Sequence, residues 1–287
     1  MSGPGRVSVR RTAKLFIGGE FPRSESGRAY EVRSHDGRTL AHAAQASRKD
    51  LRDAVKAARA AQAGWAARTA FNRGQVLYRV AELMEGRRGQ FETELADAGA
   101  ENPARGVDAA IDRWVWYAGW ADKVAQVRGA SNPVAGPYFN FTVPEPTGVV
   151  GIVAPQDQSL LGLVSRLAPA IVGGNSAVVI ASERAPLPAV SLGEVLATSD
   201  VPGGVVNLLT GITAELVPWL AGHMDVNAID VTGVAGELLA DAERAAAENV
   251  KRVVRAPDAD PFDERAQSPY EITALMEFKT VWHPIGA

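Results

Sequence analysis

Side chains that commonly carry covalent or metal chemistry are scarce in this sequence. The chain has 287 residues and no cysteine, which excludes disulfides, thiolate zinc sites and a cysteine nucleophile. Its histidines are His35, His42, His223 and His283, and none has the spacing of a metal ligand set. We therefore expect surface or loop histidines and no metal site.

Carboxylates and glycines offer two further kinds of candidate site. The acidic run from Asp258 to Glu264 could hold a cation, but a solvated loop is the ordinary interpretation of such a run. Gly18-Gly19 and Gly173-Gly174 could cradle a phosphate, yet neither pair belongs to a GxGxxG or Walker pattern. We therefore interpret both pairs as tight turns.

Composition and charge limit the partners of the chain. A net charge of -3 gives no general attraction to nucleic acid, and no apolar run approaches the ~20 residues that span a bilayer. Residues 1–13 contain three arginines and no apolar core, so we expect a disordered tail and no signal peptide. These features predict a cytoplasmic globular protein that binds small molecules or other proteins.

Hydrophobic periodicity indicates the elements that would position any site. Helical spacing predicts helices near 51–58, 76–84 and 107–127, and the aromatic cluster at 114–120 is better explained by burial than by ligand stacking. Short apolar strands then alternate with helices, at 149–153, 177–180, 205–209, 226–231 and 250–254. This alternation predicts an α/β fold with a doubly wound parallel sheet, which binds ligands at the carboxyl ends of its strands.

Three segments do not fit this alternation. Residues 129–147 contain turn signals and an alternating strand, which predict a hairpin that leaves the main body. Residues 256–267 are acidic and interrupted by proline, as in a linker. Residues 268–287 end in an apolar strand that needs an edge to pair with.

Four blocks in order resemble the aldehyde dehydrogenase family. They are Glu145–Pro155, Leu167–Asn175, Pro202–Gly211 and His223–Gly233, and Glu277–Trp282 resembles the strand that ends family members. The resemblance implies a Rossmann-like cofactor domain from 14–128 and 148–255, with 129–147 and 268–287 as a β oligomerisation element. The linker at 256–267 stands where the family has its catalytic domain. The pattern is most similar to the second, truncated copy of the tandem aldehyde dehydrogenase class.

The resemblance also implies that the catalytic parts are lost. The family's thiol nucleophile has no counterpart, and Arg252–Pro257 stands where the LELGGK motif carries the general base. Asp157 takes the position of the oxyanion-binding amide, where an ionised carboxylate would repel the alkoxide. A turn or a helix N-cap before Leu160 is the alternative role for Asp157. We expect no enzyme activity from the chain on its own.

Cofactor binding is judged from the same resemblance. Glu183 matches the family's ribose-binding carboxylate. Ile180 stands where the family has a lysine, and Thr213 and Val217 stand where it has phosphate-loop glycines. Val234 stands where it has a serine. These changes remove hydrogen-bond donors to the cofactor and add side-chain atoms to the loop that would approach its phosphates. We therefore expect no cofactor and interpret Glu183 as an exposed turn or N-cap carboxylate, with NAD(P) binding through Glu183 as the alternative.

The retained β elements favour a role in assembly. In the family, the closing strand of one subunit joins the catalytic-domain sheet of its partner, and this chain has no such sheet to offer. The expected function is a non-catalytic subunit that supports or regulates a full-length aldehyde dehydrogenase. The alternatives are an NAD(P)-dependent oxidoreductase that acts on aldehydes without a cysteine, and a nucleotide-sensing module. The expected interface residues are Tyr138, Phe139, Phe141, Val143, Leu275, Glu277, Lys279 and Val281.

Overall fold

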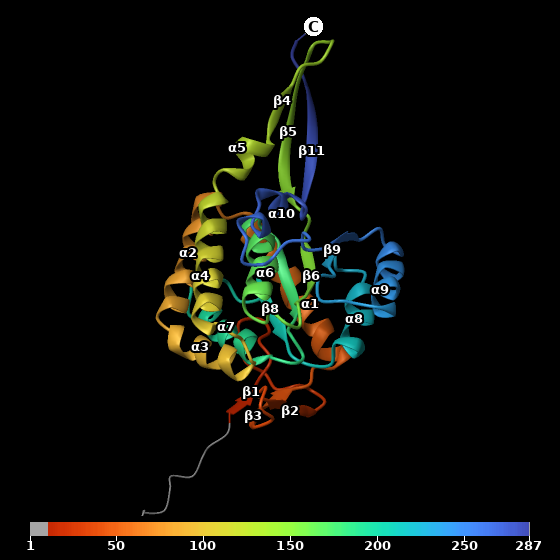
Figure 1. Cartoon of the computed structure of the whole chain (residues 1–287). Coiled ribbons are helices and arrows are strands. Elements are labelled where there is room, and N and C mark those ends of the chain that lie inside the picture. The colour runs from red at the N-terminus through yellow and green to blue at the C-terminus, as the bar shows by residue number, and fades with distance from the viewer. Residues whose placement is uncertain (1–10, 287) are drawn as a thin grey trace, which may run out of the picture.

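A computed structural model describes residues 11–286. Figure 1 shows three β-sheets arranged along the long axis of the molecule, with a five-stranded parallel sheet in the middle. The order of that sheet is β10-β9-β6-β7-β8. Its strands are β6 (Val149–Val153), β7 (Ser176–Ile180), β8 (Val206–Leu209), β9 (Ala228–Asp230) and β10 (Arg252–Val254).

The parallel sheet confirms the predicted fold class, and each expected apolar run overlaps one of its strands. β6, β7, β8 and β9 are buried along their whole length, as expected for a parallel sheet that is covered on both faces. The strand order reverses next to β6, because β7 and β8 follow on one side and β9 and β10 on the other. The crevice between the carboxyl ends of β6 and β9 is therefore the topological switch point, where ligands bind in such sheets.

Helices cover both faces of the parallel sheet. Val149 and Val153 of β6 belong to a core cluster with α1, α8 and α9, whereas Val150 and Ile152 belong to a cluster with α2, α4, α6 and α7. The helices are α1 (Arg48–Ala66), α2 (Ala70–Glu85), α3 (Arg88–Asp97), α4 (Pro103–Trp120), α5 (Val124–Arg128), α6 (Leu161–Val172), α7 (Leu187–Leu196), α8 (Thr213–Ala221), α9 (Glu237–Ala247) and α10 (Pro269–Thr273). Within residues 11–286, no helix has both the length and the apolarity needed to cross a bilayer.

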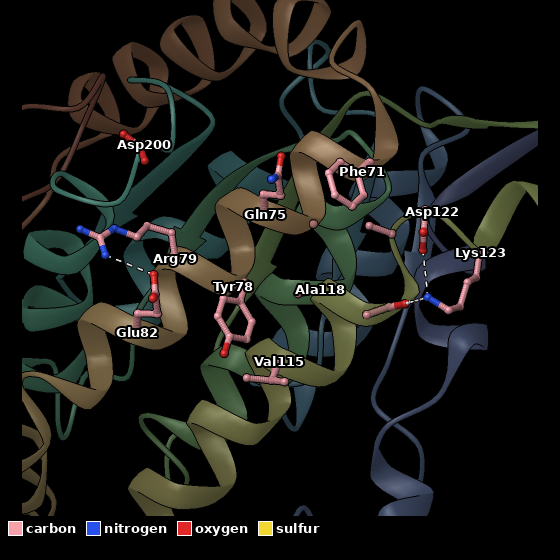
Figure 2. Close-up of a pocket in the computed structure, with 13 residues that line it drawn as sticks. Phe71, Gln75, Tyr78, Arg79, Glu82, Val115, Ala118, Asp122, Lys123 and Asp200 are labelled. Carbon is pink, nitrogen blue, oxygen red and sulfur yellow. Dashed lines mark hydrogen bonds and ion pairs between the residues drawn. The ribbon is translucent and has the colours of Figure 1, made fainter.

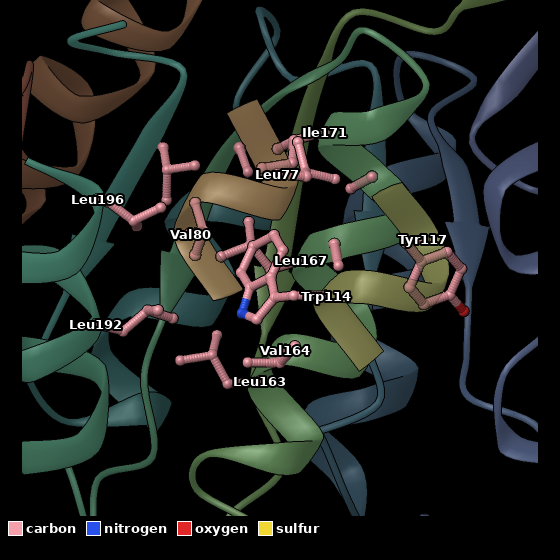
Figure 3. Close-up of a cluster of buried hydrophobic side chains, with 14 of the residues drawn as sticks. Leu77, Val80, Trp114, Tyr117, Leu163, Val164, Leu167, Ile171, Leu192 and Leu196 are labelled. Carbon is pink, nitrogen blue, oxygen red and sulfur yellow. The ribbon is translucent and has the colours of Figure 1, made fainter. Parts of the chain in front are cut away.

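The second of these clusters buries the aromatic residues of α4. Figure 3 shows Trp114 among Leu77 and Val80 of α2 and Leu163 and Leu167 of α6. Trp114 is fully buried, as is Tyr117 one turn along. The predicted burial of this cluster is confirmed, although Trp116 and Trp120 are only partly buried.

A small sheet at the N-terminal end corrects one expectation. Its order is β1-β3-β2, formed by β1 (Arg11–Ala13), β2 (Ala29–Arg33) and β3 (Thr39–Ala44). The predicted tail is wrong for residues 11–13, because Arg11 pairs with Ala41 of β3 and its guanidinium contacts Glu94 and Glu194. Residues 1–10 lie outside the described part of the chain. The periodicity did not predict β2 or β3.

A third, antiparallel sheet projects from the body, as the hairpin prediction required (Figure 1). Its order is β11-β5-β4, with β4 (Ala130–Asn132), β5 (Tyr138–Pro146) and β11 (Met276–Pro284). β11 pairs with β5 over nine residues, from Met276 opposite Pro146 to Pro284 opposite Tyr138. The linker between β10 and α10 holds a 3₁₀ turn at Glu264–Ala266.

Two arginines, one of them buried, fasten the base of the projecting sheet to the body. Arg166 of α6 is 2.5 Å from Asp230 of β9 and 2.6 Å from Glu271 of α10. Arg252 of β10 ion-pairs with Glu277 at 2.9 Å and also donates to the Met276 carbonyl oxygen. Removing one member of a buried ion-paired set is strongly destabilising, so the contacts of Arg166 are the stronger link between α6, β9 and α10.

Candidate functional site

The switch-point crevice is closed at its base by two touching loops. Gly233 follows β9 and donates its N–H to the Val153 carbonyl oxygen at 2.9 Å. A Cβ at Gly233 would lie 2.1 Å from the Ala154 carbonyl oxygen, so only glycine fits there. The backbone of the loops after β6 and β9 is therefore in contact at the carboxyl ends of these two strands.

Asp157 lies in an exposed bend after β6 and contacts only one charged group. Its carboxylate is 2.9 Å from Arg184, and both side chains are at least 75% exposed. An ion pair this exposed contributes little to stability. The N-cap alternative is wrong, because α6 begins after Leu160 without a side-chain cap. The turn interpretation agrees with the bend.

Gln156, for which the sequence suggested no role, bridges three elements at the carboxyl edge of the sheet. Its side-chain oxygen accepts the N–H of Glu183 at 2.9 Å, and its side-chain nitrogen donates to the Thr213 hydroxyl at 3.4 Å. Its backbone oxygen accepts the Ser182 hydroxyl. An amide can do this because it carries both donors and an acceptor. These contacts join the loops after β6 and β7 to the start of α8.

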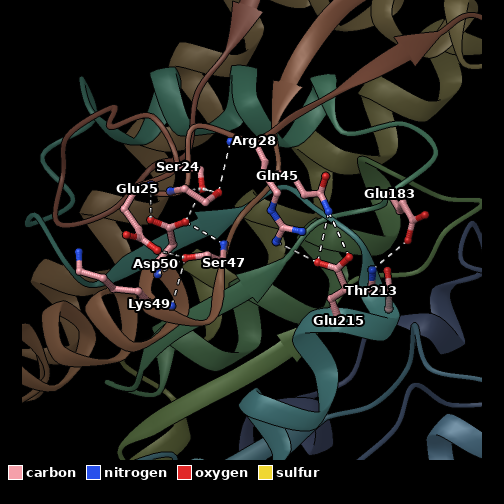
Figure 4. A network of polar contacts seen from close by, with 11 residues as sticks. Ser24, Glu25, Arg28, Gln45, Ser47, Lys49, Asp50, Glu183, Thr213 and Glu215 are labelled. Atoms are coloured by element: carbon pink, nitrogen blue, oxygen red, sulfur yellow. Dashed lines mark hydrogen bonds and ion pairs between the residues drawn. The ribbon is translucent and has the colours of Figure 1, made fainter.

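Glu183 is a helix cap in this structure. Figure 4 shows its carboxylate beside Thr213, whose backbone N–H donates to it at 2.9 Å. A carboxylate at a helix N-terminus satisfies an open donor and interacts favourably with the helix dipole. Glu183 therefore caps a helix of another segment and not one of its own, and it is half-buried and not exposed.

The other substituted positions are part of the apolar core. Ile180 and Val217 are fully buried and Val234 is nearly so, in the cluster that joins the sheet to α8 and α9. Their apolar side chains leave no donor for a ribose or phosphate oxygen. Together with the capped α8 N-terminus, they argue against a dinucleotide at this edge.

The linker at 256–267 covers the same edge of the sheet. The N–H of Ala256 donates to the Thr232 hydroxyl at 2.8 Å, and the buried guanidinium of Arg113 donates to the carbonyl oxygens of Pro261 and Ala266 at 2.8 and 3.1 Å. A cavity of about 210 Å³ remains below the linker. Among its lining residues are Pro155, Gly162, Thr232, Pro257, Ala259 and Pro261.

The histidines remain scattered in the folded chain. Residues 11–286 contain no group of three His, Asp or Glu side chains placed to hold a metal ion. His223 lies before β9, where its Nδ1 accepts the N–H of Asp225 at 3.2 Å and burial lowers its pKa. His283 is exposed on β11.

A separate pocket of about 620 Å³ lies between α2 and α4 (Figure 2). Four of its charged side chains are paired with each other, Arg79 with Glu82 at 3.1 Å and Lys123 with Asp122 at 2.9 Å, and Asp200 also lines the pocket. None of the residues expected to form a site lines this pocket.

The projecting sheet brings most of the expected interface residues together. Strand residues alternate between faces, and six of the eight share one face. They are Phe139, Phe141, Val143, Glu277, Lys279 and Val281. Tyr138 lies on the other face, where its ring centroid is 5.7 Å from that of Trp282.

Leu275 is a wrong interface assignment, and two aromatic residues were missed. Leu275 precedes β11 and is 1% exposed, because it packs in the main core at the base of the sheet. Phe278 and Trp282 are 46% and 58% exposed on the face that carries Tyr138. Phe278 and Trp282 are four positions apart in the expected strand, so they share one face, and this spacing was the signal for them.

The terminal strand finds the edge that the sequence required. β11 finds its pairing strand, β5, within the same chain, so only its outer edge is open to another chain. β4 pairs with no more than Asn140–Thr142 of β5. Beyond β4, Pro144 and Pro146 lack the N–H groups that would point outward along that edge.

Residues 21–256 match the sequence profile of the aldehyde dehydrogenase family. The cytosolic aldehyde dehydrogenase 1 of Elephantulus edwardii is 34% identical over 257 residues, which cover 86% of this chain and 50% of that protein. Retinal dehydrogenase 2 of Homo sapiens is 34% identical over 250 residues, or 84% and 47% of the two chains.

Solved structures give the same relationship. The NAD+ complex of aldehyde dehydrogenase from Bacillus cereus superposes with a TM-score of 0.79 at 27% identity, covering 86% of this chain and 51% of that one. The chain thus spans about half the length of the relatives that it matches.

Proposed function

This chain belongs to the aldehyde dehydrogenase family, and we propose that it is a non-catalytic subunit. In this proposal it assembles with, and supports or regulates, a full-length NAD(P)-dependent aldehyde dehydrogenase. The sequence contains no cysteine, so the nucleophile for aldehyde oxidation would come from the partner.

The observation that carries the proposal is the projecting sheet with apolar side chains exposed on both faces. Phe139 and Val281 are 47% and 39% exposed on one face, and Phe278 and Trp282 are exposed on the other. A group of exposed aromatic residues on a rigid projection is typical of a protein contact. At the carboxyl edge of the parallel sheet, by contrast, a hydrogen-bond donor that a cofactor could use is already paired within the chain. The N–H of Thr213 donates to the carboxylate of Glu183.

Co-expression with a full-length aldehyde dehydrogenase, followed by size exclusion with light scattering, tests the proposal. We expect co-elution, and we expect the double variant Phe139→Ser and Phe141→Ser to reduce the co-eluting fraction at least tenfold. Phe71→Ser is a matched control, because Phe71 is 63% exposed on α2. Separate elution of the unaltered chain would contradict the proposal.

Titration calorimetry separates this role from nucleotide sensing. We expect no saturable heat with NAD, NADP or ATP, because the N–H of Thr213 already binds Glu183 and Ile180 offers no donor. A measurable affinity for one nucleotide would favour a sensor. Production of NADH from an aldehyde by the isolated chain would favour a cysteine-independent oxidoreductase.

A further inference from the structure

The outer face of α1 carries a row of basic side chains. Arg48, Arg52, Lys56 and Arg59 follow one another at helical spacing, so they lie on one face of the helix. At ~1.5 Å per residue, the row is roughly 16 Å long. Arg48, Arg52 and Lys56 are exposed, and Arg59 is half-buried. α1 therefore presents a line of positive charge to the solvent.

Two shallow hollows follow this row. One, of about 480 Å³, lies at the start of α1, and the other, of about 320 Å³, lies between α1 and the loop before β9. The charged residues that line them are Arg48, Lys49, Arg52, Lys56, Arg59, Glu25 and Asp225. Asp53 lies beside them and ion-pairs with Lys49 at 3.2 Å. Positive charge is thus in excess on this surface, although the net charge of the chain is -3.

Neighbouring side chains hold two of the arginines in place. The guanidinium of Arg48 stacks on the ring of Trp219, 3.8 Å from its centroid. Arg59 contacts the carboxylate of Asp225 at 2.7 Å and also donates to the side-chain oxygen of Asn227. Side chains that are fixed before a ligand arrives lose less entropy when it binds. The two ends of the basic row are therefore organised in advance.

We propose that this surface binds an extended acidic segment of a protein partner. Alternate side chains of an extended segment are ~6.8 Å apart, close to the ~6 Å rise from Arg48 to Arg52 and from Arg52 to Lys56. Carboxylates in alternate positions would each meet one basic side chain, and guanidinium groups match carboxylates in geometry.

Two observations favour a peptide over other anionic partners. The ring of Trp219 would be the stacking platform for a nucleic acid base, but Arg48 already stacks on it. The hollows along α1 fit a chain that lies in them better than the flat surface of a bilayer. α1 belongs to the body, apart from the projecting sheet (Figure 1), so this surface is additional to the one proposed for assembly.

Fluorescence anisotropy of a labelled peptide tests the proposal. The probe has about eight residues, roughly 27 Å when extended, in which glutamate and alanine alternate; its control has glutamine in place of glutamate. We expect saturable binding of the glutamate peptide alone, with at least a tenfold loss of affinity in ~1 M salt, where charges are screened beyond ~3 Å. Arg52→Glu combined with Lys56→Glu should weaken binding at least tenfold. Absence of saturable binding would refute the proposal.

A second double variant controls for net charge. Arg184→Glu with Arg244→Glu makes the same change in net charge at two arginines that are each 75% exposed and lie outside the hollows. It should change the affinity less than twofold, and an equal loss in the two double variants would refute the site. Tighter binding of an oligothymidylate than of the peptide would overturn the choice of partner. Binding to phosphatidylserine vesicles without binding of the peptide would overturn it as well.

Carbodiimide coupling locates the bound peptide. The reagent joins a carboxylate to an amine in contact with it, and α1 offers Lys49 and Lys56. We expect the peptide on these two lysines. Lys123 and Lys279 are at least as exposed as Lys49, so equal coupling at either would refute the site. Both tests use the chain alone, so they succeed or fail independently of assembly with an aldehyde dehydrogenase.

Discussion

The carboxylate of Glu183 accepts the backbone N–H of Thr213 at 2.9 Å and thereby caps α8. The residue that precedes α8, Ile212, has no side chain that can do so. The cap is therefore supplied from the loop that follows β7. In this arrangement Glu183, an acidic residue at the edge of the sheet, has a structural role.

Replacing Glu183 should test that role. We expect Glu183→Ala to lower the free energy of unfolding by about 1 kcal/mol, the usual contribution of a helix cap. Glu237→Ala removes an exposed carboxylate from the first turn of α9, where no cap contact is lost, and should have a smaller effect. Denaturant unfolding measures both; equal effects would show that the contact with Thr213 contributes nothing.

Val250 should be a position where substitution stabilises the protein. It has a φ of 55° after α9, a left-handed conformation that is costly for a β-branched residue. It is also 93% exposed, so its side chain contributes no packing. We expect Val250→Gly to raise the free energy of unfolding by about 1 kcal/mol. Val127→Gly, at an exposed helical site on α5, should lower it.

The sequence predicted those strands and turns that a local residue pattern determines. Apolar runs such as Val149–Val153 identified the strands, because a parallel strand buried on both faces is mostly apolar. Turn residues such as Pro133 and Gly136 identified the hairpin. β3 escaped notice because its alanines and His42 lack the β-branched residues that mark strands.

Contacts between distant residues could not be predicted in the same way. Thr142 and Thr280, whose hydroxyls are 3.0 Å apart, are separated by 138 positions, and no local pattern specifies that pairing. Gln156 and Arg113 were missed for a related reason. A polar residue next to an apolar segment does not reveal which backbone groups it will satisfy once the chain folds.

Arg113 should hold the linker on the sheet. Its guanidinium is 3% exposed and donates to the carbonyl oxygens of Pro261 and Ala266. Arg113→Met should cost about 3 kcal/mol, because hydrogen bonds from a charged donor are lost. It should also speed tryptic cleavage after Arg265 in the linker. Arg105→Met, which removes a cation stacked on the Phe262 ring, should cost less than 1 kcal/mol. Unchanged cleavage in Arg113→Met would contradict this role.

Lys251 should make stability depend on pH in the alkaline range. Its ammonium donates to the carbonyl oxygens of His223 and Val226, and burial lowers its pKa from 10.5 to about 8. Below pH 8 both the folded and the unfolded chain hold the proton. Between about pH 8 and 10 only the unfolded chain does, so the free energy of unfolding gains an upward slope there. We expect Lys251→Met to lose that slope and Lys56→Met, at an exposed position of α1, to keep it. Denaturant unfolding at pH 7, 8, 9 and 10 measures the slope, and parallel curves for the unaltered chain and Lys251→Met would show that Lys251 does not titrate in this range.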